Sequence, residues 1–375
     1  MAKILHAQYM PKKYGGSETL ISLLKYRSKH SHELGYAQRK FGQETGFFYQ
    51  KIISDFEEHA KNQDCLADIV HTHFIFGGIP FQETGIPTVC GSHCLFSEEF
   101  KLAQFDTSST SDREELLQAH DFFSNLEQKF YPVARNLIVH SEFHKKELEL
   151  IGGKPTYLEL PLNVSDFDLK VPKSNLKKAI GIPDKFTLLF LGRPTYLKGF
   201  SVLAEAFEKL PSDMQLLVVG DFGLSDNRIF YSPCVNADSG NQEMRFFDVG
   251  DRVFVRPPVD HTSSPVFFGA ADVLICPSFY EAVGYVNLEA MASSTFVIGS
   301  NTAGIPYVVD NRKTGLLFET GNSTDLARKI IEAYSDRRLS EQLIANARDY
   351  VEKYDLKKII PKYDELYSKV GELNV

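Results

Sequence analysis

The 375-residue sequence contains no tryptophan and only five cysteines, Cys65, Cys90, Cys94, Cys234 and Cys276. Because the cysteines are odd in number and form no Cys-x-x-Cys pair, they indicate neither a disulfide framework nor a zinc knuckle. No uninterrupted apolar stretch reaches the length of a membrane span, and the start of the chain lacks the pattern of a signal peptide. We therefore expect a cytoplasmic protein that is soluble or at most peripheral at a membrane.

Basic residues are fewer than acidic ones, 41 against 49, so the formal net charge is −8. This balance argues against general nucleic-acid binding, which needs a broad basic surface. Residues 1–51 are an exception, with nine Lys or Arg against three Glu, a local excess of 9 − 3 = 6. A solvated helix face accounts for such an excess. The aromatic run Phe47–Tyr49 beside Arg39 and Lys40 keeps an anionic acceptor or peripheral membrane contact open.

The chain alternates between strand and helix patterns, and it does so twice. A strand is predicted at Ile4–Tyr9, followed by a glycine turn at Tyr14–Glu18 that opens a helix. Further strands are predicted at 67–73, 86–90 and 136–140 and then, after an irregular stretch, at 186–191, 214–220, 253–256, 272–276 and 295–299. This order predicts an α/β protein with two doubly wound parallel sheets that face a cleft.

The irregular stretch Pro161–Lys173 marks the expected hinge. We predict a first domain at 1–165, a second at 166–355, and a C-terminal helix at 356–375 that crosses back to the first domain. Three local features are also predicted: a capping box at Ser111–Glu114 that opens a helix after a mobile loop, a long loop at 221–250, and a helical tail at 324–373. The apolar face expected in that tail contains Ala327, Ile330, Ile331 and Ala333.

Two carboxylates eight residues apart, Glu281 and Glu289, span a predicted strand-to-helix turn. The helix starts near Gly284, so Glu281 lies in the turn and Glu289 within the helix. The first backbone N–H groups of that helix offer a place where a diphosphate can dock. Each glutamate can accept hydroxyls of a sugar or ribose, although the motif by itself also fits a capping acid and an exposed helix glutamate.

Two cations follow the strand predicted at 186–191, at the sheet edge where such folds bind ligands. Arg193 and Lys198 are suited to hold a diphosphate and to stabilise the negative charge that builds on a leaving group. Two solvated loop cations are the alternative. His71 and His73 raise the question of a metal pair, but no acidic third ligand stands beside them, which favours a structural role and no metal site.

In combination, these motifs resemble family 4 retaining glycosyltransferases of the GT-B fold, and the resemblance covers essentially the whole chain. The matching segments are the two-glutamate motif Glu281–Glu289, the G-R-x(4)-K-G motif Gly192–Gly199, the glycine loop Tyr14–Glu18, the D-V-V-H-x-H element Asp68–His73, and the strand-end histidine His93.

The resemblance implies a role for each of these residues. Glu281 would bind a hydroxyl of the donor sugar, Glu289 the ribose, and Arg193 with Lys198 the diphosphate. His93 would reach the donor sugar from across the cleft, although a lone histidine at a strand end is as often structural. The other donor-binding residues implied are Gly15, Gly16, Gly284, Tyr285 and Val286.

The chain departs from the family pattern at three places. The linker motif reads Leu160–Asp166 without its usual glycine, so the hinge geometry is expected to differ. Tyr307 stands where a glutamate is usual. The pair Gly91-Ser92 before His93 is also unusual, so the loop is expected to hold the imidazole differently.

The sequence as a whole predicts a hexosyltransferase-type enzyme that moves a sugar from a nucleoside diphosphate donor, a UDP- or GDP-sugar, to a hydroxyl acceptor. The acceptor is left open among a saccharide, a lipid-linked molecule and a small molecule. Retention at the anomeric carbon follows from the resemblance, and no metal or further cofactor is expected. A sugar-nucleotide epimerase and a non-catalytic sugar-nucleotide-binding protein stay open as alternatives. A dinucleotide oxidoreductase is disfavoured because no G-x-G-x-x-G follows a predicted strand, and a metal-dependent transferase because its Asp166–Asp168 dyad lies in the linker.

Overall fold

The structure is a computed structural model, and it describes residues 2–9, 24, 28–29, 31–37, 67–73, 85–103, 110–193, 195–220, 224–225, 228–231, 245–248 and 250–372. The chain forms two compact units. The first contains residues 1–101, 114–161 and 354–375, and the second contains residues 102–113 and 162–353. Among the described residues, no helix combines the length and apolar character needed to cross a bilayer.

The first unit is built on a six-stranded parallel sheet in the order β2-β1-β3-β4-β5-β6. Its strands are β1 (Lys3–Tyr9), β2 (Ser31–Ala37), β3 (Ile69–Thr72), β4 (Thr88–Ser92), β5 (Leu137–Val139) and β6 (Thr156–Tyr157). Strands β3, β4 and β5 are buried along their whole length. Such burial is typical of parallel strands covered on both faces, and it explains why they read as short apolar runs.

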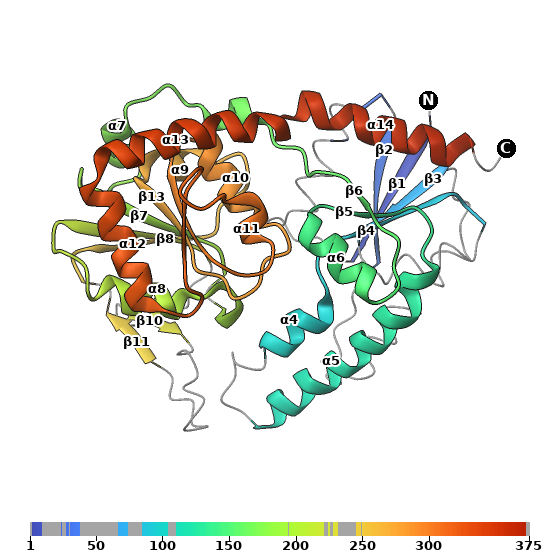
Figure 1. The fold of residues 1–375 in the computed structure, drawn as a ribbon, viewed down its shortest axis with the longest axis horizontal. Helices are drawn as coiled ribbons and strands as arrows, with labels where there is room; N and C mark the ends of the chain where they lie inside the picture. Colours follow the sequence, from blue (N-terminus) through green and yellow to red (C-terminus); the bar gives the residue numbers. More distant parts are fainter. Residues whose placement is uncertain are drawn as a thin grey trace. The chain divides into compact units, whose positions relative to one another are not determined.

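The described helices of the first unit include α4 (Phe96–Ala103), α5 (Thr110–Phe130), α6 (Glu142–Leu150) and α14 (Leu356–Glu372). Helix α6 begins after Ser141, whose hydroxyl accepts the backbone N–H of His144 at 3.1 Å and caps the first turn. Helix α14, from the far end of the sequence, packs against β3 (Figure 1). The last residues of the chain thus help to complete the first unit.

The second unit is built on a parallel sheet in the order β12-β8-β7-β13-β14-β15. Its strands are β7 (Phe186–Leu191), β8 (Met214–Val219), β12 (Val253–Arg256), β13 (Val273–Cys276), β14 (Phe296–Ser300) and β15 (Leu316–Phe318). Its helices are α7 (Lys173–Ala179), α8 (Phe200–Phe207), α9 (Ser264–Ala270), α10 (Tyr285–Ala292), α11 (Ile305–Val308), α12 (Ser323–Ser335) and α13 (Arg337–Val351). Helix α12 packs against α8, and α13 against α10 (Figure 1).

The two parallel sheets confirm the predicted fold class, and three local predictions were wrong. Residues 221–250 are not one long loop, because they include the antiparallel strands β9 (Leu224–Ser225), β10 (Arg228–Tyr231) and β11 (Arg245–Asp248). The aromatic and β-branched residues of β10 and β11 favour strands more strongly than the surrounding polar residues favour a loop.

The other two errors concern helix α5 and helix α12. Helix α5 already includes Thr110, so Ser111 lies inside the helix and does not cap it. In α12, Ala327, Ile330 and Ala333 are buried as predicted, whereas Ile331 is 41% exposed. One residue further along a helix turns the side chain by about 100°, which moves Ile331 off the buried face.

Candidate functional site

The candidate site lies where the strand order of the second sheet reverses. After β7 the chain adds β8 and β12 on one side and then returns to place β13 on the other side of β7. Loops that leave the carboxyl ends of two such strands diverge, and this is where doubly wound sheets bind their ligands. The loops concerned are residues 192–199 after β7 and residues 277–284 after β13.

These two loops touch through their backbones. Gly199 has a φ of 65°, and a β-carbon added there would lie 2.0 Å from the carbonyl oxygen of Pro277. The N–H of Phe279 donates to the carbonyl of Leu197 at 2.8 Å, and the rings of Tyr196 and Phe279 stack with centroids 4.6 Å apart. A glycine is therefore required at 199 both by conformation and by the close approach.

The contact between the loops brings together the predicted cation and carboxylate. The Lys198 ammonium donates to Oε1 of Glu281 at 2.6 Å, and the Ser278 hydroxyl donates to the same oxygen at 3.1 Å. Both side chains of the ion pair are about one-fifth exposed, 22% and 18%. The pair is thus partly desolvated and still partly exposed to solvent.

Helix α10 begins at Gly284, which has a left-handed φ of 72°. The Asn287 side-chain amide donates to the Gly284 carbonyl at 3.0 Å and fixes this first turn. Tyr285 and Val286 follow as the first two helical residues, and both are partly exposed. The predicted helix start is confirmed, and it directs the first turn of α10 toward the same edge of the sheet as Glu281.

Glu289 is not an exposed helix glutamate: it lies in α10 with only 5% exposure. Its Oε1 is 2.9 Å from Nδ1 of His261. Burial would lower the pKa of His261, but the hydrogen bond and charge of Glu289, with smaller contributions from Asp166 and Asp260, raise that pKa above its usual value. The histidine thus supplies the positive partner that a buried carboxylate needs.

His261 was missed by the sequence analysis. It lies in the loop between β12 and α9, which leaves the carboxyl end of a strand in the same sheet. A polar residue between a predicted strand and a helix was the available signal. Its pairing with Glu289, 28 positions away, depends on tertiary structure, and sequence spacing does not reveal it.

The other residues of this unit that the sequence analysis singled out lie at the surface. Arg193 is exposed, directly after Gly192 at the end of β7. Tyr307, which stands where a glutamate was expected, is 41% exposed in α11. Asp168 forms an ion pair with Lys170 at 2.6 Å, which is an ordinary surface pairing.

His93 lies in the first unit, among a set of histidines at the carboxyl half of its sheet. Its Nε2 is 3.3 Å from Nδ1 of His73. Burial is the main cause that lowers the pKa of His93, with further lowering from His140, His73 and His144. The imidazole is therefore neutral at pH 7. Gly15 and Gly16 fall outside the described residues, and so do most of the basic residues of the segment 1–51.

Comparisons with known proteins agree on one class. Residues 172–350 match the family described as glycosyl transferases group 1. The chain is 28% identical over 281 residues to a D-inositol 3-phosphate glycosyltransferase from Pseudarthrobacter chlorophenolicus, in a match that covers 72% of this chain and 63% of that protein. It is 30% identical over 190 residues to an alpha-maltose-1-phosphate synthase from Mycolicibacterium smegmatis, covering 48% and 47% of the two chains. These matches support a glycosyltransferase.

Solved structures with the same fold match this chain over nearly its whole length. Sucrose-phosphate synthase from Thermosynechococcus elongatus superposes with a TM-score of 0.78 at 19% identity, covering 100% of both chains. HepE from Anabaena, solved in complex with UDP-glucose, gives a TM-score of 0.72 at 18% identity, with 98% of this chain and 100% of that chain covered. At these identities the likeness is one of fold, and it confirms the GT-B class expected from the sequence.

Proposed function

We propose that this protein is a retaining glycosyltransferase that moves a hexose from a nucleoside diphosphate to a hydroxyl acceptor. One observation carries the proposal: two acid–base pairs, Lys198–Glu281 and His261–Glu289, lie at the carboxyl edge of the second sheet. The first is partly open and lies beside the reversal of strand order. In the second pair the Glu289 carboxylate is buried, with 7% exposure, and its partner His261 is 25% exposed. One pair suits a reacting group and the other a fixed binding contact.

The donor is a sugar nucleotide in this proposal. Lys198 and Arg193 would face the diphosphate, and the first turn of α10 from Tyr285 would add its dipole. The hydrogen bonds from Lys198 and Ser278 to Glu281 are both accepted by Oε1. In this proposal Oε2 accepts a hydrogen bond from a sugar hydroxyl. Glu289, held by His261, would accept the ribose hydroxyls. The likeness in fold to HepE, which was solved with UDP-glucose, supports a UDP-sugar over the GDP-sugar that the sequence also allows.

Charge stabilisation is the main task of the site in the proposed reaction. As the bond from the anomeric carbon to the phosphate oxygen breaks, negative charge grows on the diphosphate, and Lys198 and Arg193 would stabilise it. The departing phosphate oxygen takes the proton of the acceptor hydroxyl, which attacks from the same face. This course gives retention. It requires no divalent ion on the diphosphate, because the two cations take that role.

For the acceptor we propose a small phosphorylated molecule. The relative from Pseudarthrobacter chlorophenolicus is named for D-inositol 3-phosphate, and the basic excess in residues 1–51 favours an anion. Peripheral contact with an anionic membrane stays a prediction for the same segment. Sedimentation with anionic and neutral vesicles at low and high salt tests it, since such attraction weakens as salt screens charge over about 10 Å at 0.1 M.

A donor screen followed by product analysis tests the function. Thermal shift with a panel of nucleoside diphosphate sugars identifies the donor, because a ligand at a hundred times its Kd stabilises by about 2.7 kcal/mol. Nuclear magnetic resonance then follows the anomeric proton with phosphorylated and unphosphorylated acceptors. A product with the donor's anomeric configuration is expected. A changed sugar without acceptor would reveal an epimerase, and binding without turnover on any acceptor would reveal a non-catalytic protein.

A further inference from the structure

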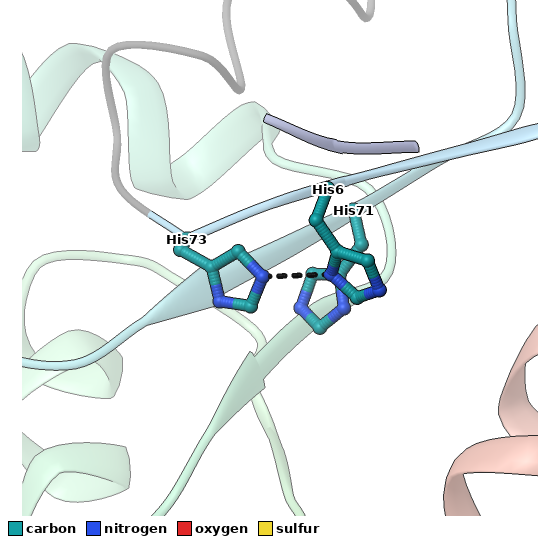
Figure 2. Close-up of side chains that lie close together, drawn as sticks. All are labelled: His6, His71 and His73. Carbon is teal, nitrogen blue, oxygen red and sulfur yellow. Dashed lines mark hydrogen bonds between the residues drawn. The ribbon is translucent and has the colours of Figure 1, made fainter. Parts of the chain in front are cut away.

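Three fully buried histidines meet on one face of the sheet in the first unit. Strands β1 and β3 are parallel neighbours, and their register places His6 opposite His71. His73 follows His71 by two residues and therefore points to the same face. All three side chains have 0% exposure. Figure 2 shows the three rings gathered together, each carried by the backbone of a strand or its end.

The ring nitrogens are close enough to share one ion. One nitrogen from each of His6, His71 and His73 lies within 4.8 Å of the other two, and Nδ1 of His6 is 2.9 Å from Nε2 of His73. In a tetrahedral zinc site, with Zn–N bonds of 2.0–2.1 Å, ligand nitrogens are roughly 3.4 Å apart. The observed spacings, from 2.9 Å to at most 4.8 Å, lie on both sides of this value.

One nitrogen of this group has no partner in the part of the chain that the structure describes. Nε2 of His71 is buried and forms no hydrogen bond there. It lies beside Gly91 of β4, where a β-carbon would come within 3.0 Å of it. The glycine thus leaves open the space beside Nε2. Because a buried polar atom without a partner costs free energy, its presence points to an absent ligand.

The opposite side of the His71 ring is fixed. Its Nδ1 is 2.7 Å from the hydroxyl of Tyr367 in α14, a residue with 0% exposure. Metal-bound histidines commonly direct their second ring nitrogen to such a partner, which sets the tautomer and the orientation of the ring. When Nδ1–H donates to Tyr367, the lone pair of Nε2 is the one available to an ion.

We propose that His6, His71 and His73 bind a divalent transition-metal ion, with Zn²⁺ as the best candidate. Three neutral imidazoles suit Zn²⁺ better than Mg²⁺ or Ca²⁺, which prefer oxygen ligands. An imidazole binds a metal ion through the lone pair of its neutral form, which predominates at pH 7.5 for an unperturbed histidine.

The sequence carries no local signal for the third ligand. His6 precedes His71 by 65 positions, and only the pairing of β1 with β3 brings them together. This site goes beyond the proposed sugar transfer and does not depend on it. Its three residues belong to the first unit, whereas Lys198, Glu281, His261 and Glu289 belong to the second.

The test uses the full-length protein, freed of metal by a chelator that is then removed. Calorimetric titration with Zn²⁺ at pH 7.5 is expected to show one ion per chain. His6→Gln, His71→Gln and His73→Gln are each expected to weaken binding by about a hundredfold or more, and Tyr367→Phe by about tenfold. His120→Gln, a histidine of the same unit outside the cluster, serves as the matched control and should bind as the wild type does.

X-ray absorption of the zinc-loaded wild type keeps the test independent of whether the variants fold. Three nitrogen ligands at about 2.0–2.1 Å are expected. No stoichiometric Zn²⁺ binding, an absorption spectrum dominated by sulfur or oxygen ligands, or folded His71→Gln and His73→Gln variants that bind as tightly as His120→Gln would each overturn the proposal.

Discussion

Lys198 and Glu281 are 83 positions apart in sequence, yet the lysine ammonium donates to the glutamate at 2.6 Å and joins the loop after β7 to the loop after β13. The close backbone contact between Gly199 and Pro277 holds the two loops together. A cation and a carboxylate so placed can act on neighbouring parts of one ligand.

The two glutamates should affect different kinetic constants. Glu289→Gln is expected to weaken binding of the free nucleoside diphosphate by about tenfold, or about 1.4 kcal/mol, because its contacts would be the same in the ground and transition states. Glu281→Gln is expected to lower kcat by roughly a hundredfold with a smaller change in donor affinity. Calorimetry and steady-state kinetics measure both, with the exposed Glu208→Gln as control. Unchanged nucleotide affinity in Glu289→Gln contradicts the ribose assignment.

Removal of either donor-site cation should slow the chemical step. Lys198→Met and Arg193→Met are each expected to lower kcat by roughly a hundredfold, the usual scale for the loss of a preorganised charge partner. Lys178→Met, an exposed lysine of the same unit, is the control.

Added Mg²⁺ or Mn²⁺ should leave the wild-type rate unchanged. The measurement uses zinc-loaded protein, so that the three-histidine cluster stays in one state throughout. A rate that depends on Mg²⁺ or Mn²⁺ would show that the two cations do not replace a metal.

The His261–Glu289 pair should make stability depend on pH. The pKa of His261 is raised in the folded state, so the stabilisation is complete below about 6.5, the pKa of an unperturbed histidine. It is lost as pH rises through the folded pKa. The difference in Tm between wild type and His261→Gln should therefore be larger at pH 6 than at pH 9. A difference that stays constant over this range speaks against the pair, and His120→Gln again provides the matched control.

The first unit should show the opposite dependence. Burial is the main cause that lowers the pKa of His140, to about 4 from 6.5, and it also lowers the pKa values of His71, His73 and His93. Stability is then complete above about 6.5 and falls as pH drops toward 4. His140 alone should account for about 3 kcal/mol at pH 4. One opposing group is Glu127, whose pKa burial raises to about 7.

Hydrogen exchange of β3, β4 and β5 between pH 7.5 and 5, corrected for intrinsic rates and in the presence of chelator, measures this loss. Protection should weaken as pH falls, and less so in His140→Gln. Protection that is constant or grows toward acid pH would mean that these histidines are not held neutral by the fold.

Gly199→Ala should destabilise the second unit by at least about 2 kcal/mol. The new β-carbon would lie 2.0 Å from the Pro277 oxygen, and the left-handed backbone adds strain. Gly250→Ala, where a β-carbon meets nothing within 4 Å, should change stability by less than about 0.5 kcal/mol. Equal Tm values for the two variants would mean that the loops yield easily and that the close contact does not fix the site.

Much of the fold could be predicted from local sequence patterns. The run Phe186–Leu191 and the six buried residues of β8 read as strands because a parallel strand covered on both faces needs apolar residues along its whole length. The turn before α10 was predicted because Gly284 and the apolar stripe after it are local features. The errors arose where local signals competed, as at β10 and β11 with their aromatics set among polar residues.

The partners of the site residues were decided by the tertiary structure alone. The sequence by itself determined the positions of Glu281, Glu289 and Lys198 relative to their own strands and helices. It did not show that His261 would pair with Glu289, or that His6 would lie beside His71, because both pairings depend on which strands become neighbours and in what register. Register is a non-local property, set by how whole apolar faces pack, so no spacing along the chain reveals it.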